Sequence, residues 1–182
     1  MQYYKIIRKD LKHYNHTYQL GINHDELFFR PSGSCEPGGL YFTTKEHLPK
    51  YWNLGYYIAD IDLLPNEPIY KDPQGDKWKT PAFSIRKLTP MTEHELFQDK
   101  EFCLKMLEYQ PWFLPHMKQD YEIYLAAVKS SGCTLKFVPF GQQTDELKLE
   151  AVKNDPMALR YAFNPSLETC KIAVKKAAST IL

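Results

Sequence analysis

The sequence lacks any apolar run close to the ~20 residues that a membrane-spanning helix needs. Its opening residues, MQYYKIIRKDLKHY, also lack the apolar core of a secretory signal. No sign of charge dominates, because 23 basic and 22 acidic side chains nearly cancel. No overall field therefore attracts a nucleic-acid backbone or an anionic membrane. We expect a soluble intracellular protein with neither nucleic acid nor a membrane as its partner.

Cysteine is scarce, and none of the close pairs used by zinc ribbons or redox motifs is present. The four cysteines are Cys35, Cys103, Cys133 and Cys170. Without a secretory signal, reduced thiols are expected. His13 and His16 stand three residues apart but have no second close pair, so no metal site is predicted. A phosphate loop, a dinucleotide fingerprint and a Ser-His-Asp order are also missing at usable spacing, so we predict no catalytic residues and no cofactor.

Residues 1–90 contain short apolar stretches bounded by Gly, Pro, Asn or Asp, a pattern typical of strands and tight turns. The stretches are YYKII, YQLGI, ELFF, GGLYFT, YYIADIDLL and AFSI. Within residues 57–63 apolar side chains alternate with others, which predicts one buried face and an outward direction for Asp60 and Asp62.

One stretch of this half, TTKEHLPKYW, has helical character. Thr43 or Thr44 can act as the N-cap, and Glu46 is close enough to complete a capping box. We therefore predict an α+β head domain over residues 1–90, with a twisted, mainly antiparallel sheet and a short helix.

Beyond Pro90 glycine almost vanishes and apolar residues recur at three- and four-residue spacing, which indicates helix. The segment also repeats, with successive offsets of 21, 24 and 22 residues. The first three units have an acid, two apolar residues, a helix breaker and a closing leucine, as in Glu122, Leu125, Val128, Gly132 and Leu135. The last unit keeps Glu168 and Val174 but has no breaker. Units this short must stack on their neighbours to bury a core.

We predict an all-α repeat array over residues 91–182, with units near 99–115, 120–138, 144–162 and 167–182. One set of equivalent side chains is expected to form its core: Leu104, Leu125, Val128, Leu135, Leu149, Val152 and Leu159.

The stretches AAVKSSGCTLKFV and EAVKNDPMALRYA resemble a short tandem helical repeat of unknown function found in giant DNA viruses and some intracellular bacteria. Ala127, Val128, Gly132 and Leu135 match its pattern, whereas Pro156 replaces the usual glycine of the next unit. The resemblance covers roughly residues 99–182.

The run SGSCEPGGLYFT, residues 32–43, is similar to a head domain of giant-virus proteins, several of which carry ankyrin repeats behind it. Such proteins resemble interaction modules that act on the infected host. The resemblance implies a viral source, a location in the cytoplasm of the host cell and a host protein as a candidate partner, and it leaves association with the virion open.

The segment Gly38-Gly39-Leu40-Tyr41-Phe42 is also similar to a segment of ADP-ribosyltransferases, in which a glycine turn leads to a tyrosine that stacks on nicotinamide. That likeness implies ligand contacts by Gly38, Gly39 and Tyr41, with His16 as a candidate partner. The strand AFSIRKL offers no acid, so the catalytic set is incomplete. A structural role, a turn followed by a buried tyrosine, is the alternative that we prefer.

We therefore expect a non-enzymatic protein-interaction module, with an active or decayed NAD-binding domain as the alternative. Aromatic residues around Pro111 and Pro115 form a candidate interaction surface, with packing between the two domains as the alternative that we prefer. Its members are Tyr109, Trp112, Phe113 and His116.

Overall fold

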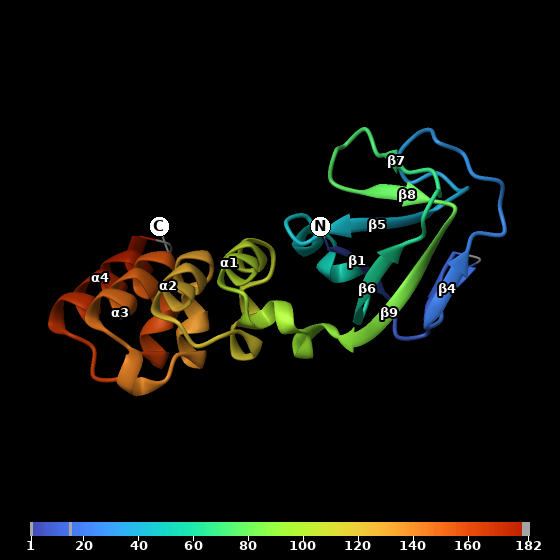
Figure 1. The fold of residues 1–182 in the computed structure, drawn as a ribbon. Helices are drawn as coiled ribbons and strands as arrows, with labels where there is room; N and C mark the ends of the chain where they lie inside the picture. Colours follow the sequence, from blue (N-terminus) through green and yellow to red (C-terminus); the bar gives the residue numbers. More distant parts are fainter. Residues whose placement is uncertain (1, 15, 180–182) are drawn as a thin grey trace. The chain divides into compact units, whose positions relative to one another are not determined.

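The computed structural model describes residues 2–14 and 16–179. The chain divides into two compact units, Met1–His94 and Glu95–Leu182. The first contains a seven-stranded antiparallel sheet in the order β4-β9-β6-β1-β5-β8-β7 (Figure 1). Its strands are β1 (Tyr3–Ile7), β4 (Gly21–His24), β5 (Leu40–Thr44), β6 (Tyr57–Leu63), β7 (Tyr70–Lys71), β8 (Trp78–Thr80) and β9 (Ala82–Pro90). A separate hairpin joins β2 (Lys12–His13) to β3 (His16–Thr17). The predicted fold class is confirmed.

One face of the sheet forms the main apolar core. Alternate residues of the strands point to it, as the pattern of residues 57–63 predicts. Its buried members are Ile7, Tyr18, Leu40, Phe42, Ala59, Ile61, Phe83 and Ile85.

The second face of the sheet is covered as well, so the prediction that Asp60 points outward is wrong. Asp60 is 3% exposed and lies 3.5 Å from Nε2 of His94, whereas Asp62 is exposed as expected. His94, which follows β9, packs on this face, where its ring also lies edge-on to Tyr4 with 5.9 Å between ring centroids. A polar residue in an alternating strand is buried when a second layer covers its face.

The predicted short helix forms as the 3-10 helix η1 (Leu48–Leu54). His47 occupies the N-cap position without a capping side-chain bond, so neither Thr43 nor Thr44 is the N-cap. The ELFF strand was predicted wrongly. The chain leaves the sheet at Asp25, whose carboxylate accepts a hydrogen bond from the Leu27 amide and forms a turn, and Phe28 is 88% exposed.

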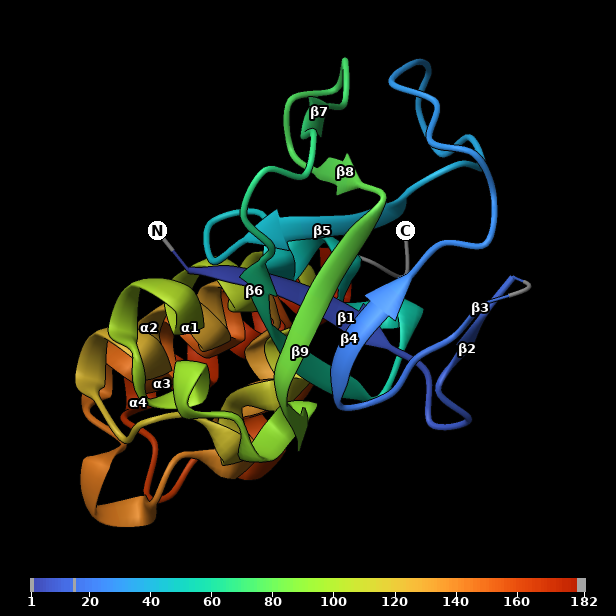
Figure 2. The same ribbon diagram turned by 45° about the vertical axis from the view of Figure 1, so that its right-hand side comes forward.

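The second unit is built from helices that alternate with 3-10 helices. The helices are α1 (Lys100–Tyr109), α2 (Tyr121–Ser130), α3 (Asp145–Asn154) and α4 (Leu167–Ser179), and they lie side by side in chain order (Figures 1 and 2). Between them run η4 (Pro111–His116), η5 (Gly132–Phe137), η6 (Phe140–Gln142) and η7 (Pro156–Tyr161). Two more 3-10 helices, η2 (Met91–Glu93) and η3 (Glu95–Gln98), precede α1. No strand occurs after Pro90 among the described residues.

Capping residues keep the predicted repeat register. Asp99, Asp120, Thr144 and Ser166 stand at offsets of 21, 24 and 22 residues, and each accepts a hydrogen bond from an amide in the first turn of its helix. The breaker positions also agree, because Pro111, Gly132 and Pro156 each begin a 3-10 helix.

The predicted core positions are only partly right. Val128, Leu135 and Val152 are buried, but Leu104, Leu125, Leu149 and Leu159 are only half-buried. The buried stripe instead follows Phe102, Cys103, Met106 and Leu107 in α1 and its equivalents. These are Ile123, Tyr124, Ala127 and Val128 in α2, and Leu147, Lys148, Ala151 and Val152 in α3. α2 and α3 each contact the helix before and the helix after in the chain.

Candidate functional site

The first unit contains a cavity of about 630 Å³, here called the head cavity. Its wall is formed by β1, β5, the β2–β3 hairpin and the loops that follow β4. Consecutive residues of one strand line it, namely Tyr4, Lys5 and Ile6 of β1 and Leu40 to Thr43 of β5. Neighbouring side chains on a strand point to opposite faces of the sheet. A cavity lined by consecutive residues of both strands is therefore reached from both faces, and it lies where β1 and β5 separate.

The register of the strands shows where they part. β1 and β5 pair at Tyr3↔Thr44 and Tyr4↔Thr43, and no further pair follows. Beyond this point the Lys5 ammonium donates a hydrogen bond of 2.7 Å to the carbonyl oxygen of Tyr41. A lysine side chain thus occupies the position where a ladder hydrogen bond would otherwise form.

Lys5 is buried, with 8% of its surface exposed, and its Nζ lies 5.0 Å from the centroid of the Tyr18 ring. Burial lowers the pKa of Lys5 to about 7. No carboxylate forms an ion pair with it among the described residues. The amine is therefore poised to change its charge near neutral pH.

Gly38, Gly39 and Tyr41 stand at the cavity as the turn that leads into β5. The two glycines have φ of +89° and +138°, as the expected tight turn requires. A Cβ atom on Gly38 would lie 2.6 Å from the carbonyl oxygen of Phe28. Tyr41 lines the cavity and is half-buried, so the expectation of a buried tyrosine is wrong.

The hydroxyl group of Tyr41 is engaged with its own loop. It accepts from the Glu36 amide at 3.1 Å and donates to the Glu36 carbonyl at 3.2 Å. Burial raises the pKa of Tyr41, although the backbone hydrogen bond at Glu36 opposes that rise. The ring is thereby fixed, with the ammonium groups of Lys77 and Lys79 at 5.7 and 5.4 Å from its centroid.

Two histidines line the same cavity. The ring of His16 lies edge-on to Tyr18, with a centroid distance of 4.4 Å. Its Nε2 atom is buried and has no hydrogen-bond partner among the described residues. Burial lowers the pKa of His13, and the nearby charges of Lys5 and Arg8 lower it further. The structure thus brings His16 and Tyr41 into one cavity.

The acids around the cavity are mostly committed to structure. Asp25 accepts a 2.6 Å hydrogen bond from the Gly39 amide as well as the Leu27 bond, which fixes the glycine turn. Lys77 forms an ion pair with buried Asp72 at 3.6 Å and donates to Sγ of Cys35 at 3.1 Å. No group of three or more His, Cys, Asp or Glu side chains could hold a metal ion in the part of the chain that was described.

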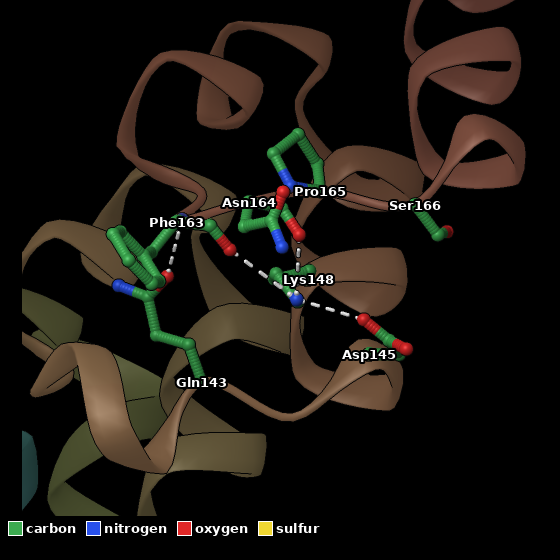
Figure 3. A pocket seen from close by; sticks show the side chains of 7 residues that line it. All are labelled: Gln143, Asp145, Lys148, Phe163, Asn164, Pro165 and Ser166. Atoms are coloured by element: carbon green, nitrogen blue, oxygen red, sulfur yellow. Dashed lines mark hydrogen bonds and ion pairs between the residues drawn. The ribbon is translucent and has the colours of Figure 1, made fainter.

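A second pocket lies in the repeat array, over the connections that flank α3 (Figure 3). The buried Lys148 pairs with Asp145 at 2.7 Å and donates to the carbonyls of Phe163 and Asn164, both at 3.3 Å. The side-chain oxygen Oε1 of Gln143 accepts a hydrogen bond of 2.8 Å from the backbone amide of Phe163. These polar groups bond α3 and the segment before it to the segment between η7 and α4. The pocket therefore serves the packing of neighbouring repeat units.

The predicted aromatic surface around Pro111 is divided by the fold. Tyr109 and Trp112 are 42% and 44% exposed, and His116 is exposed. Phe113 is half-buried and packs edge-on against Phe97, with 5.7 Å between ring centroids. Phe113 therefore contributes mainly to packing within the second unit.

Aromatic residues that were not predicted extend this surface along the 3-10 helices. Trp112 packs against Phe137 of the next unit at 5.9 Å, and the Lys136 ammonium lies 4.6 Å from both rings. One unit further on, Arg160 lies 5.1 Å from the Tyr161 ring. Lys136 and Arg160 are 24 residues apart, the offset of the repeat, so the spacing of these pairs could have been read from the sequence.

The repeat array also has an exposed aromatic pair. The rings of Phe140 and Phe163 stack with centroids 5.2 Å apart, although the side chains are 67% and 58% exposed. We call Trp112, Lys136, Phe137, Phe140, Arg160, Tyr161 and Phe163 the aromatic surface.

Comparison with known proteins agrees with the repeat and with the resemblance to giant-virus proteins. A family model described as "Domain of unknown function (DUF4116)" matches residues 99–141 and again 120–167. Its two matches start 21 residues apart, which is the offset between the first two units. No solved structure matches the chain.

Proteins of Acanthamoeba polyphaga mimivirus are similar to the chain. "Putative ankyrin repeat protein R868" is 37% identical over 81 residues, which cover 42% of this chain and 40% of that protein. "Putative ankyrin repeat protein L100" is 36% identical over 108 residues, which cover 56% of this chain and 17% of that protein. "Putative ankyrin repeat protein R229" is 37% identical over 65 residues, 34% of this chain and 21% of that protein. The matches thus span less than half the length of these relatives, and the expected similarity to giant-virus proteins is confirmed.

Proposed function

We propose that this chain is a non-enzymatic protein-interaction module that recognises its partner through the aromatic surface of the repeat array. The observation that carries this proposal is the exposed Phe140–Phe163 stack, in a repeat array that also holds two cation–aromatic groups at equivalent positions of neighbouring units. Exposed aromatic and arginine side chains dominate the binding energy of many protein interfaces. Stacked repeats present them as one extended surface.

Similarity to ankyrin repeat proteins supports an interaction role for the chain. The viral relatives further suggest a host protein as the partner, met in the cytoplasm of the host cell. No helix of the described residues is long and apolar enough to cross a membrane.

The test is capture from an amoebal extract on the immobilised full chain. A variant with Phe140→Ser and Phe163→Ser removes the exposed stack, and Phe28→Ser removes an 88% exposed aromatic of the first unit as a matched control. We expect a defined protein to be retained by the wild type and the control and lost from the double variant. Equal capture by all three proteins would refute the aromatic surface as the recognition site. Thermal unfolding of each protein checks that the surface changes leave the fold intact.

An NAD-binding head domain is the alternative function, because Tyr41 and His16 line the head cavity together. Against a transferase stands the engagement of Asp25 with two backbone amides, which leaves it poorly placed to support a developing cation. Calorimetric titration with NAD on the wild type and on Tyr41→Ala separates the two functions. Micromolar binding that is lost on substitution would favour the alternative.

A further inference from the structure

We propose that the head cavity binds a small ligand that carries a phosphate or carboxylate group on a planar ring, with Lys5 anchoring the anionic group. This site is independent of the aromatic surface. It is inferred from an incompletely satisfied buried amine, an unpartnered imidazole nitrogen and three aromatic rings that line one cavity.

The Lys5 ammonium has unused hydrogen-bond donors. A protonated lysine carries three N–H groups, and one of them is used by the carbonyl of Tyr41. The Tyr18 ring attracts the ammonium but supplies no counter-charge. A buried cation without an anion is costly, and a ligand oxyanion in the cavity would both accept the remaining hydrogen bonds and neutralise the charge.

His16 lines the same cavity as Lys5. Its ring and Lys5 both contact Tyr18, and its buried Nε2 has no hydrogen-bond partner among the described residues. Buried polar atoms are rarely left unpaired unless a ligand or water completes them. Lys5 therefore supplies the charged donor for an oxyanion, and His16 is a second polar side chain of the same cavity.

The rest of the wall suits a ring. Tyr18, Tyr41 and His16 present aromatic rings to the cavity, and Tyr18 is itself held by stacking on Phe83 at 6.2 Å. Rigid aromatic side chains form favourable stacked or edge contacts with a planar ligand. The volume of about 630 Å³ lies within the range of small-molecule sites.

The acids nearby do not oppose this assignment. Asp25 already accepts two backbone hydrogen bonds, and Glu26 and Glu36 are exposed side chains. Lys77, a second cation of the wall, is paired with Asp72. The uncompensated charge of the cavity is therefore that of Lys5.

The test uses phenyl phosphate as a probe, titrated into the full chain at pH 6.5, where Lys5 and an oxyanion can both be charged. Inorganic phosphate and phenol are titrated separately to divide the contributions of the anion and the ring. We expect phenyl phosphate to bind more tightly than either fragment. Lys5→Met should weaken it about tenfold or more, the loss expected for a charged hydrogen bond.

His16→Ala provides a second variant, in which a severalfold weakening is expected. The control is Lys87→Met, which removes an exposed lysine of β9 and should leave the affinity unchanged. Thermal unfolding confirms that each variant is folded before titration. No saturable binding to the wild type, or an equal affinity in folded Lys5→Met, would overturn the proposal. Inorganic phosphate binding as tightly as phenyl phosphate would overturn the assignment of the ring.

Discussion

The side-chain amide of Asn154 donates a hydrogen bond of 2.7 Å to the main-chain carbonyl of Lys129, and so ties the end of α3 to the end of α2. Its oxygen also accepts from the Gly132 amide at 2.7 Å. The equivalent residues of the neighbouring units act alike, because Ser130 donates to the Leu107 carbonyl at 3.0 Å and Lys176 to that of Lys153. One position of the repeat thus links each helix end to the preceding helix end.

Asn154→Ala should destabilise the second unit by about 1–3 kcal/mol, because it leaves the buried Gly132 amide without its partner. Urea unfolding measures the loss. The control is Lys129→Ala, which removes an exposed side chain but keeps the carbonyl, and should change the free energy of unfolding by about 0.5 kcal/mol or less. Equal losses in the two variants would show that the link does not contribute to stability.

Gly132→Ala should also be destabilising. A Cβ atom at this position would collide with the carbonyl oxygen of Ala151 and lie 3.0 Å from the amide of Asp155. Overpacking of this kind costs about 1–3 kcal/mol. Gly141→Ala is a matched control, since nothing lies within 4 Å of its added Cβ atom. Thermal unfolding should show a lower Tm for Gly132→Ala than for Gly141→Ala, and the reverse order would contradict the close packing of the units.

The buried stripe of α2 can be tested within one helix. Ile123 is fully buried and Leu125 is half-buried, so Ile123→Ala should cost about 2–5 kcal/mol and Leu125→Ala clearly less. Chemical denaturation of both variants gives the comparison. A larger loss of unfolding free energy in Leu125→Ala than in Ile123→Ala would support the core positions predicted from the leucine pattern instead.

Local signals in the sequence predicted much of this structure. The alternation in β6 reflects the two faces of one strand, and the offsets of 21, 24 and 22 residues reflect the packing of one helical unit on the next. Asp60 is buried instead by residues distant in the sequence, such as His94, which lies against it on the second face of the sheet. The alternating pattern of one strand does not show which distant residues cover its two faces.

The head cavity could be predicted only in part. The glycine turn and Tyr41 were visible as a motif, and His16 was a candidate partner. Lys5 was missed because a lysine within YYKII is expected to point to solvent. Its burial follows from the parting of β1 and β5, which is a property of strand pairing between distant segments.

Lys5→Met should stabilise the first unit near neutral pH. The substitution keeps a side chain of similar length while removing a buried amine that lacks an anionic partner. The gain should depend on pH in a defined direction. In the folded protein the pKa of Lys5 is lowered from 10.5 to about 7, so between these values the unfolded chain binds more protons than the folded one.

The stability of the wild type relative to Lys5→Met should therefore rise as the pH is raised from 7 toward 10, because folding removes a proton from Lys5 in this range and the cost of removing it falls as the pH rises. Below pH 7 Lys5 is protonated in both states, and the full penalty, on the order of a few kcal/mol, remains. Denaturant unfolding of both proteins at pH 6.5, 8 and 9.5 measures the difference between their free energies of unfolding. The titration of all other groups is common to both proteins and cancels in this difference. A difference that stays constant across this range, or that grows with pH, would show that Lys5 is charged and compensated in the folded protein.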